Sequence, residues 1–120
     1  MSNRIRSITH HGEQILIVDF TNCSPADAED TLRALPDHVT SNPRGSVLIL
    51  ADFTDASFSE ETIRTMQQTA VFDKPYVKKS AWVGTENLPD SIRDSVSKFS
   101  RREFTVFKNR IEALEWLTAD

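Results

Sequence analysis

The stretch Val47-Leu-Ile-Leu-Ala-Asp-Phe-Thr-Asp-Ala-Ser-Phe-Ser-Glu-Glu-Thr62 decides the fold of this chain. It begins with a continuous apolar run, which is typical of a strand that is covered on both faces of a sheet. Small polar residues then turn the chain, and Ser59, Glu60 and Glu61 have the composition of a helix start. The stretch therefore predicts a buried strand that leads directly into a helix.

The same alternation continues on both sides of this stretch. Further strands are expected at residues 5–9, 14–21, 81–83 and 104–107, with a turn at His11-Gly12 between the first two. Helix starts are indicated at Ser24-Pro25, Pro89 and Asn109. Pro36 should kink or end the first helix early.

Strands that alternate with helices predict an α/β fold. We expect a single domain over residues 1–120, with an open, mostly parallel sheet of four or five strands, about four covering helices and an N-terminal β-hairpin. The last three helices should each bury one apolar stripe. The three stripes are Ile63, Met66 and Ala70; Ile92, Val96 and Phe99; and Ile111, Leu114 and Leu117.

The composition is that of an ordinary soluble domain. Apolar residues make up 38% and charged residues 27% of the 120 positions, and the net charge of −4 gives nucleic-acid binding little electrostatic support. No run is long enough to span a membrane, and the single cysteine, Cys23, forms no internal disulfide. We expect a cytoplasmic protein without a cofactor; the oligomeric state stays open, and a homodimer is compatible with the sequence.

Right-handed crossovers should gather the carboxyl ends of the strands on one edge of the sheet. That edge would carry Thr21, Asn22, Ser24, Thr54, Asp55, Ser57, Ser59, Thr85 and Glu86. The opposite edge would carry Arg44, Lys78, Lys79, Arg101 and Arg102. Helix dipoles favour this separation of charge in general, so we prefer that explanation to a dedicated basic binding surface.

The strand-to-helix junction resembles that of STAS domains, the fold of the anti-sigma-factor antagonists. Asp52-Phe53-Thr54 and Phe58 match the family pattern. Glu60 stands where the family has aspartate, and Ile63 replaces a glycine. Thr62 falls where the antagonists carry their phosphorylatable serine, which makes it the candidate phosphoacceptor that the resemblance implies.

The second half of the chain is similar to the SpoIIAA-like STAS/SEC14 group. The similar segments are Lys74-Pro-Tyr-Val-Lys-Lys-Ser-Ala-Trp-Val-Gly84, Phe99-Ser-Arg-Arg102 and Glu112-Ala-Leu-Glu-Trp-Leu117. Where relatives tend to have a further glycine turn, this chain has Thr85-Glu-Asn-Leu-Pro-Asp90. The resemblance implies a small α/β domain, mostly without an assigned activity, and carriage of nonpolar ligands has been suggested for some members.

Our preferred hypothesis is a non-enzymatic binding or regulatory module that meets a protein partner through the junction. Its binding residues would be Thr54, Asp55, Ser57, Ser59 and Thr62. The alternative is a carrier of a small nonpolar, lipid-like ligand, with a lining that includes Met66, Phe72, Tyr76 and Trp82. Large aromatics are also the ordinary filling of a core, and Ser59 is first of all expected to be a helix cap.

A weaker alternative is a phosphoacceptor or hydrolase. Asp19, Asp52, Thr85 and Lys108 end four successive predicted strands, as the acids, hydroxyl and lysine of a response-regulator receiver do. A hard divalent ion needs several converging oxygens, which single acids on separate strands do not guarantee. We therefore expect Asp52 to anchor the following loop by accepting backbone N–H groups.

The remaining reactive residue types do not form an evident catalytic set. Cys23 precedes a helix start, where a thiol pKa can fall, but no histidine is placed to activate it. His10 and His11 adjoin a turn, and adjacent strand residues point to opposite faces, so we expect solvated rather than metal-bound side chains. The sequence therefore does not indicate an enzyme.

Overall fold

The computed structural model describes residues 4–119. Its elements alternate as the sequence predicts. In chain order they are β1 (Ile5–His10), β2 (Glu13–Asp19), α1 (Pro25–Thr40), β3 (Val47–Asp52), α2 (Glu60–Asp73), the short 3₁₀ helix η1 (Lys74–Tyr76), β4 (Val77–Val83), α3 (Asp90–Ser100), β5 (Thr105–Val106) and α4 (Arg110–Leu117).

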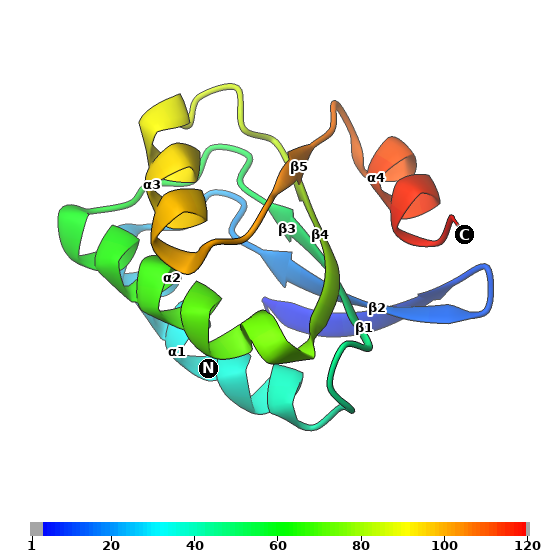
Figure 1. The fold of residues 1–120 in the computed structure, drawn as a ribbon. Helices are drawn as coiled ribbons and strands as arrows, with labels where there is room; N and C mark the ends of the chain where they lie inside the picture. The colour runs from blue at the N-terminus through cyan, green and yellow to red at the C-terminus, as the bar shows by residue number, and fades with distance from the viewer. Residues whose placement is uncertain (1–3, 120) are drawn as a thin grey trace.

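The strands form one sheet of five in the order β1-β2-β3-β4-β5 (Figure 1). β1 and β2 make the expected antiparallel hairpin, and the other neighbouring pairs are parallel. β3 is central, and all six of its residues are buried, as its apolar run predicts. The α/β fold with a mostly parallel sheet is thereby confirmed.

Helices cover both faces of the sheet. α1, α2 and α3 lie on one face, whereas α4 crosses to the other (Figure 1). The side chains of β2 and β3 alternate between two apolar clusters, one beneath the three helices and one beneath α4. Since each strand is flanked on both sides, its apolar run is continuous rather than alternating.

The helices begin where the sequence indicates. The side chains of Ser24, Ser59 and Asn109 each accept the backbone N–H of the residue three positions on. Pro36 does not end α1 early, because the helix continues to Thr40. Val39, with no exposed surface, anchors the last turn in the core.

Three predictions of burial were wrong. Phe99 and Ile111 are 55% and 74% exposed. In the short helix α4 the pair that faces the sheet is Ala113 and Leu117, spaced i, i+4, so Ile111 points away from it. The expected covered strand at 104–107 is only the two-residue β5, and both its residues are exposed because it forms the edge of the sheet.

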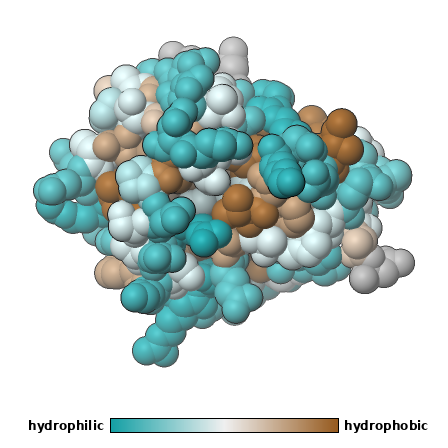
Figure 2. Space-filling model, turned by 90° about the horizontal axis from the view of Figure 1, so that it is seen from above, coloured by the Kyte–Doolittle hydropathy of each residue, from teal (hydrophilic) through white to brown (hydrophobic). Residues whose placement is uncertain are grey.

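The two edges of the sheet carry different loops. The loops that follow β2, β3 and β4 lie together at the top of Figure 1, and we call this side the polar edge. Seen from above, hydrophilic and near-neutral residues surround several apolar patches (Figure 2). At the opposite edge one open depression of about 440 Å³ is lined by Lys74, Lys78, Lys79, Arg101 and Arg102, among others. Over residues 4–119, no helix has the length and apolar character required to cross a membrane.

Candidate functional site

Two turns of similar sequence and backbone conformation lie side by side at the polar edge. The first turn spans residues 19–22 and the second spans residues 52–55, and both begin Asp-Phe-Thr. Each ends in a left-handed residue that is not glycine, Asn22 at φ +54° and Asp55 at φ +53°. Such residues are uncommon and persist where the surroundings hold them in place.

An aspartate fixes each turn in the same way. In the first turn, Asp19 Oδ1 accepts the backbone N–H of Thr21 at 3.0 Å and its hydroxyl at 2.6 Å. In the second turn, Asp52 Oδ1 accepts the backbone N–H of Thr54 at 3.0 Å and its hydroxyl at 2.7 Å. The expectation that Asp52 anchors the following loop is confirmed, and Asp19 does the same one strand away.

The backbone then joins the two turns. Asp19 and Asp52 are aligned in the parallel register of β2 and β3. The N–H of Phe20 donates to the carbonyl of Asp52 at 2.8 Å, and the N–H of Asn22 donates to the carbonyl of Thr54 at 2.9 Å. The pair of turns therefore continues the parallel backbone pairing beyond the last strand residues.

Arg110, the first residue of α4, supplies the positive charge for this unit. Its Nε donates to Asp52 Oδ2 at 2.8 Å, and its Nη2 lies 3.9 Å from Asp19 Oδ1. Arg6 lies 3.7 Å from the other oxygen of Asp19. Burial by itself would raise the pKa of Asp19, but the hydrogen bonds from Thr21 and the two arginines outweigh it and lower that pKa.

This geometry bears on the comparison with receiver domains. The structure brings Asp19 and Asp52 together, but within residues 4–119 no hydrogen bond or ion pair connects either one with Thr85 or Lys108. Both oxygens of Asp52 already have partners, and its residue is 6% exposed. A cation or phosphoryl group would first have to displace Arg110.

Gly84 closes the back of the second turn. Its φ is +71°, and a Cβ atom at this position would lie 2.6 Å from Thr54 N and 2.8 Å from Asp52 Oδ1, and closer still to Thr54 Oγ1. Such distances are far below van der Waals contact. The loop after β4 thus requires glycine in order to approach the Asp52–Thr54 hydrogen bonds.

The predicted binding residues lie along the segment from the second turn to α2. Those with exposed side chains are Thr54, Asp55, Ser57 and Ser59. Thr62 differs, because it is 2% exposed. Its hydroxyl accepts the N–H of Ser59 at 2.6 Å and donates to the carbonyl of Ser59 at 2.8 Å, so it completes the capping box. A kinase would reach Thr62 only after this helical turn had opened.

Only two of the four residues predicted to line a nonpolar site line a cavity in the structure. Met66 and Trp82 line a cavity of about 50 Å³ between the sheet and the helices α1, α2 and α3. Phe72 is 55% exposed on the outer side of α2, and Tyr76 is half-buried and does not line this cavity. Trp82 packs between Phe53 and Phe104, with ring centroids 4.5 and 4.8 Å away, as an ordinary core aromatic does.

Asp73 and Arg102 also line this cavity. Asp73 is 1% exposed, and its Oδ1 accepts no hydrogen bond from the residues that the structure describes. Burial raises the pKa of Asp73 to about 6, although the charge of Arg102 acts in the opposite direction. The guanidinium of Arg102 donates to the carbonyl of Ala70 at 3.0 Å and to the hydroxyl of Ser80 at 2.8 Å.

The histidines and the cysteine differ from expectation. His10 and His11 do not point to opposite faces, because the structure directs both toward Glu115 of α4. These three residues are the group within residues 4–119 whose donor atoms are close enough to hold a metal ion. Cys23 is buried, and burial raises its thiol pKa, which removes the basis for a reactive thiolate.

Sequence reasoning missed Arg110 and Glu115, which both come from the last helix. Arg110 carried one usable signal, because a cation in the first turn of a helix is unfavourable to the helix dipole and needs another reason to be there. Glu115 carried none, since its contacts depend on the side of the sheet to which α4 crosses.

Comparison with known proteins does not identify the chain. No protein-family model matches this sequence, and no curated protein matches it either.

Proposed function

We propose that this chain is a non-enzymatic binding or regulatory module of STAS type, which meets a protein partner through the polar edge at residues 54–62. The observation that carries the proposal is the pair of turns fixed by Asp19 and Asp52. They hold the neighbouring exposed side chains of Thr54, Asp55 and Ser57 on an ordered backbone. A surface that is ordered before binding loses less conformational entropy when a partner docks.

The state of the two aspartates supports a binding role over an enzymatic one. A general base needs an oxygen that the substrate can reach and a pKa near the working pH. Asp52 is bonded through both oxygens, and the pKa of Asp19 is lowered rather than raised. Their contacts are those of carboxylates that shape a loop.

Phosphorylation of Thr62 remains a prediction of the family resemblance. Because this hydroxyl belongs to the capping box, modification would require the first turn of α2 to open. Glu60 and Glu61, in the same turn, would repel the phosphate.

A second candidate function, binding of a small nonpolar ligand, is favoured by the cavity beside Met66 and Trp82. Its volume of about 50 Å³ is well below the roughly 150 Å³ that accommodates benzene in an engineered apolar cavity. A lipid-like molecule would therefore have to widen it by moving α2 or α3. Asp73 Oδ1 would offer such a ligand one hydrogen-bond acceptor.

Photo-cross-linking tests the preferred function. A photoreactive amino acid is placed at Ser57, on the polar edge, and for comparison at Ser41, which is exposed beyond the far end of α1. The chain is then irradiated in cells of its source. We expect a discrete protein adduct from position 57 and none from position 41; equal adducts from both positions, or none from either, would contradict the proposal.

Native mass spectrometry after gentle purification separates the second candidate from the first. A retained small molecule that is lost when Met66 is enlarged to Phe would favour the carrier function. An unliganded mass together with an adduct from position 57 would favour the partner-binding function.

A further inference from the structure

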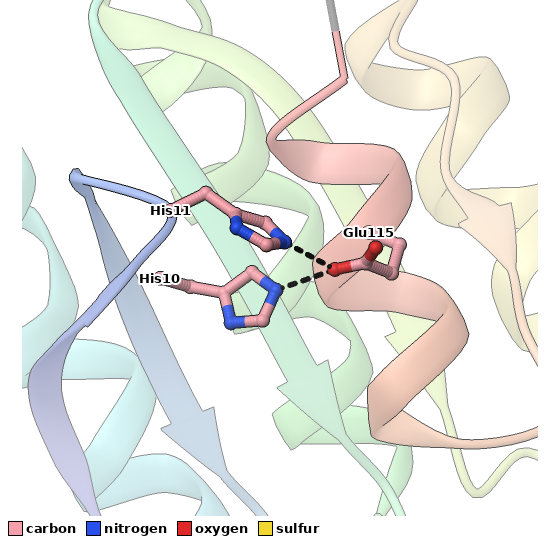
Figure 3. A group of neighbouring side chains, drawn as sticks. All are labelled: His10, His11 and Glu115. Carbon is pink, nitrogen blue, oxygen red and sulfur yellow. Dashed lines mark hydrogen bonds and ion pairs between the residues drawn. The ribbon is translucent and has the colours of Figure 1, made fainter.

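Three metal-ligating side chains meet where the tip of the N-terminal hairpin reaches α4 (Figure 3). The Nε2 atoms of His10 and His11 each lie 2.7 Å from the same atom, Oε2 of Glu115. The two imidazole rings stand edge to face, with their centroids 4.2 Å apart. All three donor atoms lie within 4.8 Å of one another.

The backbone explains why two consecutive histidines point in the same direction. His10 is the last residue of β1, but His11 has left the strand and adopts a left-handed conformation at φ +51°. Gly12 follows at φ +78°, and two such residues in succession form the tight turn of a hairpin. The alternation of side chains between the two faces of the sheet therefore ends at His10.

We propose that His10, His11 and Glu115 form a surface site for a divalent transition-metal ion of the zinc class, with water in the remaining position. Two imidazole nitrogens and one carboxylate oxygen are a donor set that suits Zn²⁺ and its neighbours better than Mg²⁺ or Ca²⁺, which prefer oxygen ligands. Three protein ligands with one open position are also the usual set for an accessible zinc ion.

The present distances allow an ion to enter after a small adjustment. Ligand atoms about 2.0 to 2.1 Å from a tetrahedral zinc ion lie roughly 3.3 Å from each other. The donor pairs that now lie at 2.7 Å must separate by about 0.6 Å. The side chains of His11 and Glu115 are 60% and 57% exposed, so they have room to rotate by this amount.

Glu115 already has the charge state that a metal ligand needs. The side chain is exposed, and an exposed glutamate is ionised at neutral pH. A bound ion would replace two hydrogen bonds with coordination bonds and would tie the hairpin to α4. Each Nε2 would first lose its proton, either to solvent or by a tautomeric shift to Nδ1 of the same ring. Since only the folded chain brings the three ligands together, binding should raise the melting temperature.

The experiment uses the full chain without an affinity tag. Isothermal titration with Zn²⁺ should show one ion per chain, and Mg²⁺ at the same concentrations should not bind. Co²⁺ should give the visible absorption bands of a tetrahedral site with nitrogen and oxygen ligands. Excess EDTA should reverse the rise in melting temperature that Zn²⁺ produces.

Two variants of the proposed ligands and one control variant test which residues form the site. His11→Asn keeps a residue that tolerates the left-handed backbone, and Glu115→Gln keeps the shape of the side chain. Each should weaken Zn²⁺ binding about tenfold or more. The matched control is His38→Ala, which removes an exposed histidine from the end of α1 and should leave the affinity unchanged.

Circular dichroism confirms that each variant is folded. The proposal is overturned if the parent chain binds no stoichiometric Zn²⁺ at tens of micromolar. It is overturned equally if His11→Asn and Glu115→Gln bind as the parent does, or if His38→Ala loses as much affinity as they do.

Discussion

Arg110 donates from Nε to Asp52 Oδ2 over 2.8 Å, although the two residues are 58 positions apart in the chain. The contact joins the first residue of α4 to the last residue of the central strand β3. It ties the layer on one face of the sheet to the loop that leads to the helices on the other face. The polar edge thus depends on both layers.

Removing this arginine should destabilise the fold. Arg110→Ala leaves the nearly buried carboxylate of Asp52 without its charged partner, which should lower the free energy of unfolding by about 1–3 kcal/mol. Urea unfolding measures the change. Arg64→Ala is the control, because Arg64 is exposed on α2 and its removal should matter by less than about 0.5 kcal/mol. Similar losses in both variants would show that the Arg110–Asp52 pair has no special role.

A methyl group at Gly84 should disturb the second turn. Gly84→Ala adds a Cβ 2.6 Å from Thr54 N, in addition to the cost of a left-handed alanine of about 1–2 kcal/mol. Gly45→Ala is a matched control, since Gly45 has φ +69° but open space around the added atom. Thermal unfolding should therefore show a distinctly larger loss for Gly84→Ala. Equal losses would mean that the close approach at Gly84 is not needed.

The contribution of the α2 cap to stability can be measured apart from that of the neighbouring loop residues. Ser59→Ala removes the oxygen that accepts the N–H of Thr62, and we expect a loss of about 1 kcal/mol in the free energy of unfolding. Ser57→Ala, which removes an exposed hydroxyl from the same loop, should cost almost nothing. If both variants unfold at the parent's urea midpoint, the capping box contributes no stability.

Asp73 should give the fold a specific pH dependence. Burial raises its pKa from 3.8 to about 6, so the folded state holds the proton more tightly than the unfolded state. The free energy of unfolding should therefore fall as the pH rises from about 4 to 6, by up to about 3 kcal/mol from this residue. Asp73→Asn should remove that slope in urea titrations, and Asp55→Asn, at an exposed position, should retain it. A slope that survives in Asp73→Asn would contradict the raised pKa.

Local signals in the sequence predicted most of the fold. The apolar run of β3 and the serines at positions 24 and 59 identify a strand and two helix starts without knowledge of their neighbours. The parallel order of the strands then gathers the loops at one edge, as the connection rules require. Segments at the edge of the sheet were harder to predict. β5 has a neighbouring strand on one side only, and the aromatic residues that flank it suggest more burial than it has.

The details of the candidate sites depended on long-range packing. The Asp-Phe-Thr sequence occurs at both turns, yet only the aligned register of Asp19 and Asp52 shows that the two turns form a pair. Arg110 and Glu115 enter their sites because α4 crosses to the face opposite the other helices. The direction of the His11 side chain was not predicted for a local reason, because its left-handed backbone breaks the alternation assumed for a strand.

Amide hydrogen exchange of the free chain tests most directly whether the polar edge is ordered before any partner binds. The N–H groups of Thr21 and Thr54 each donate to an aspartate oxygen, so both should exchange slowly, and Thr54 should lose its protection in Asp52→Ala. Exchange of these two amides at the rate of an unstructured peptide would contradict a preformed binding surface.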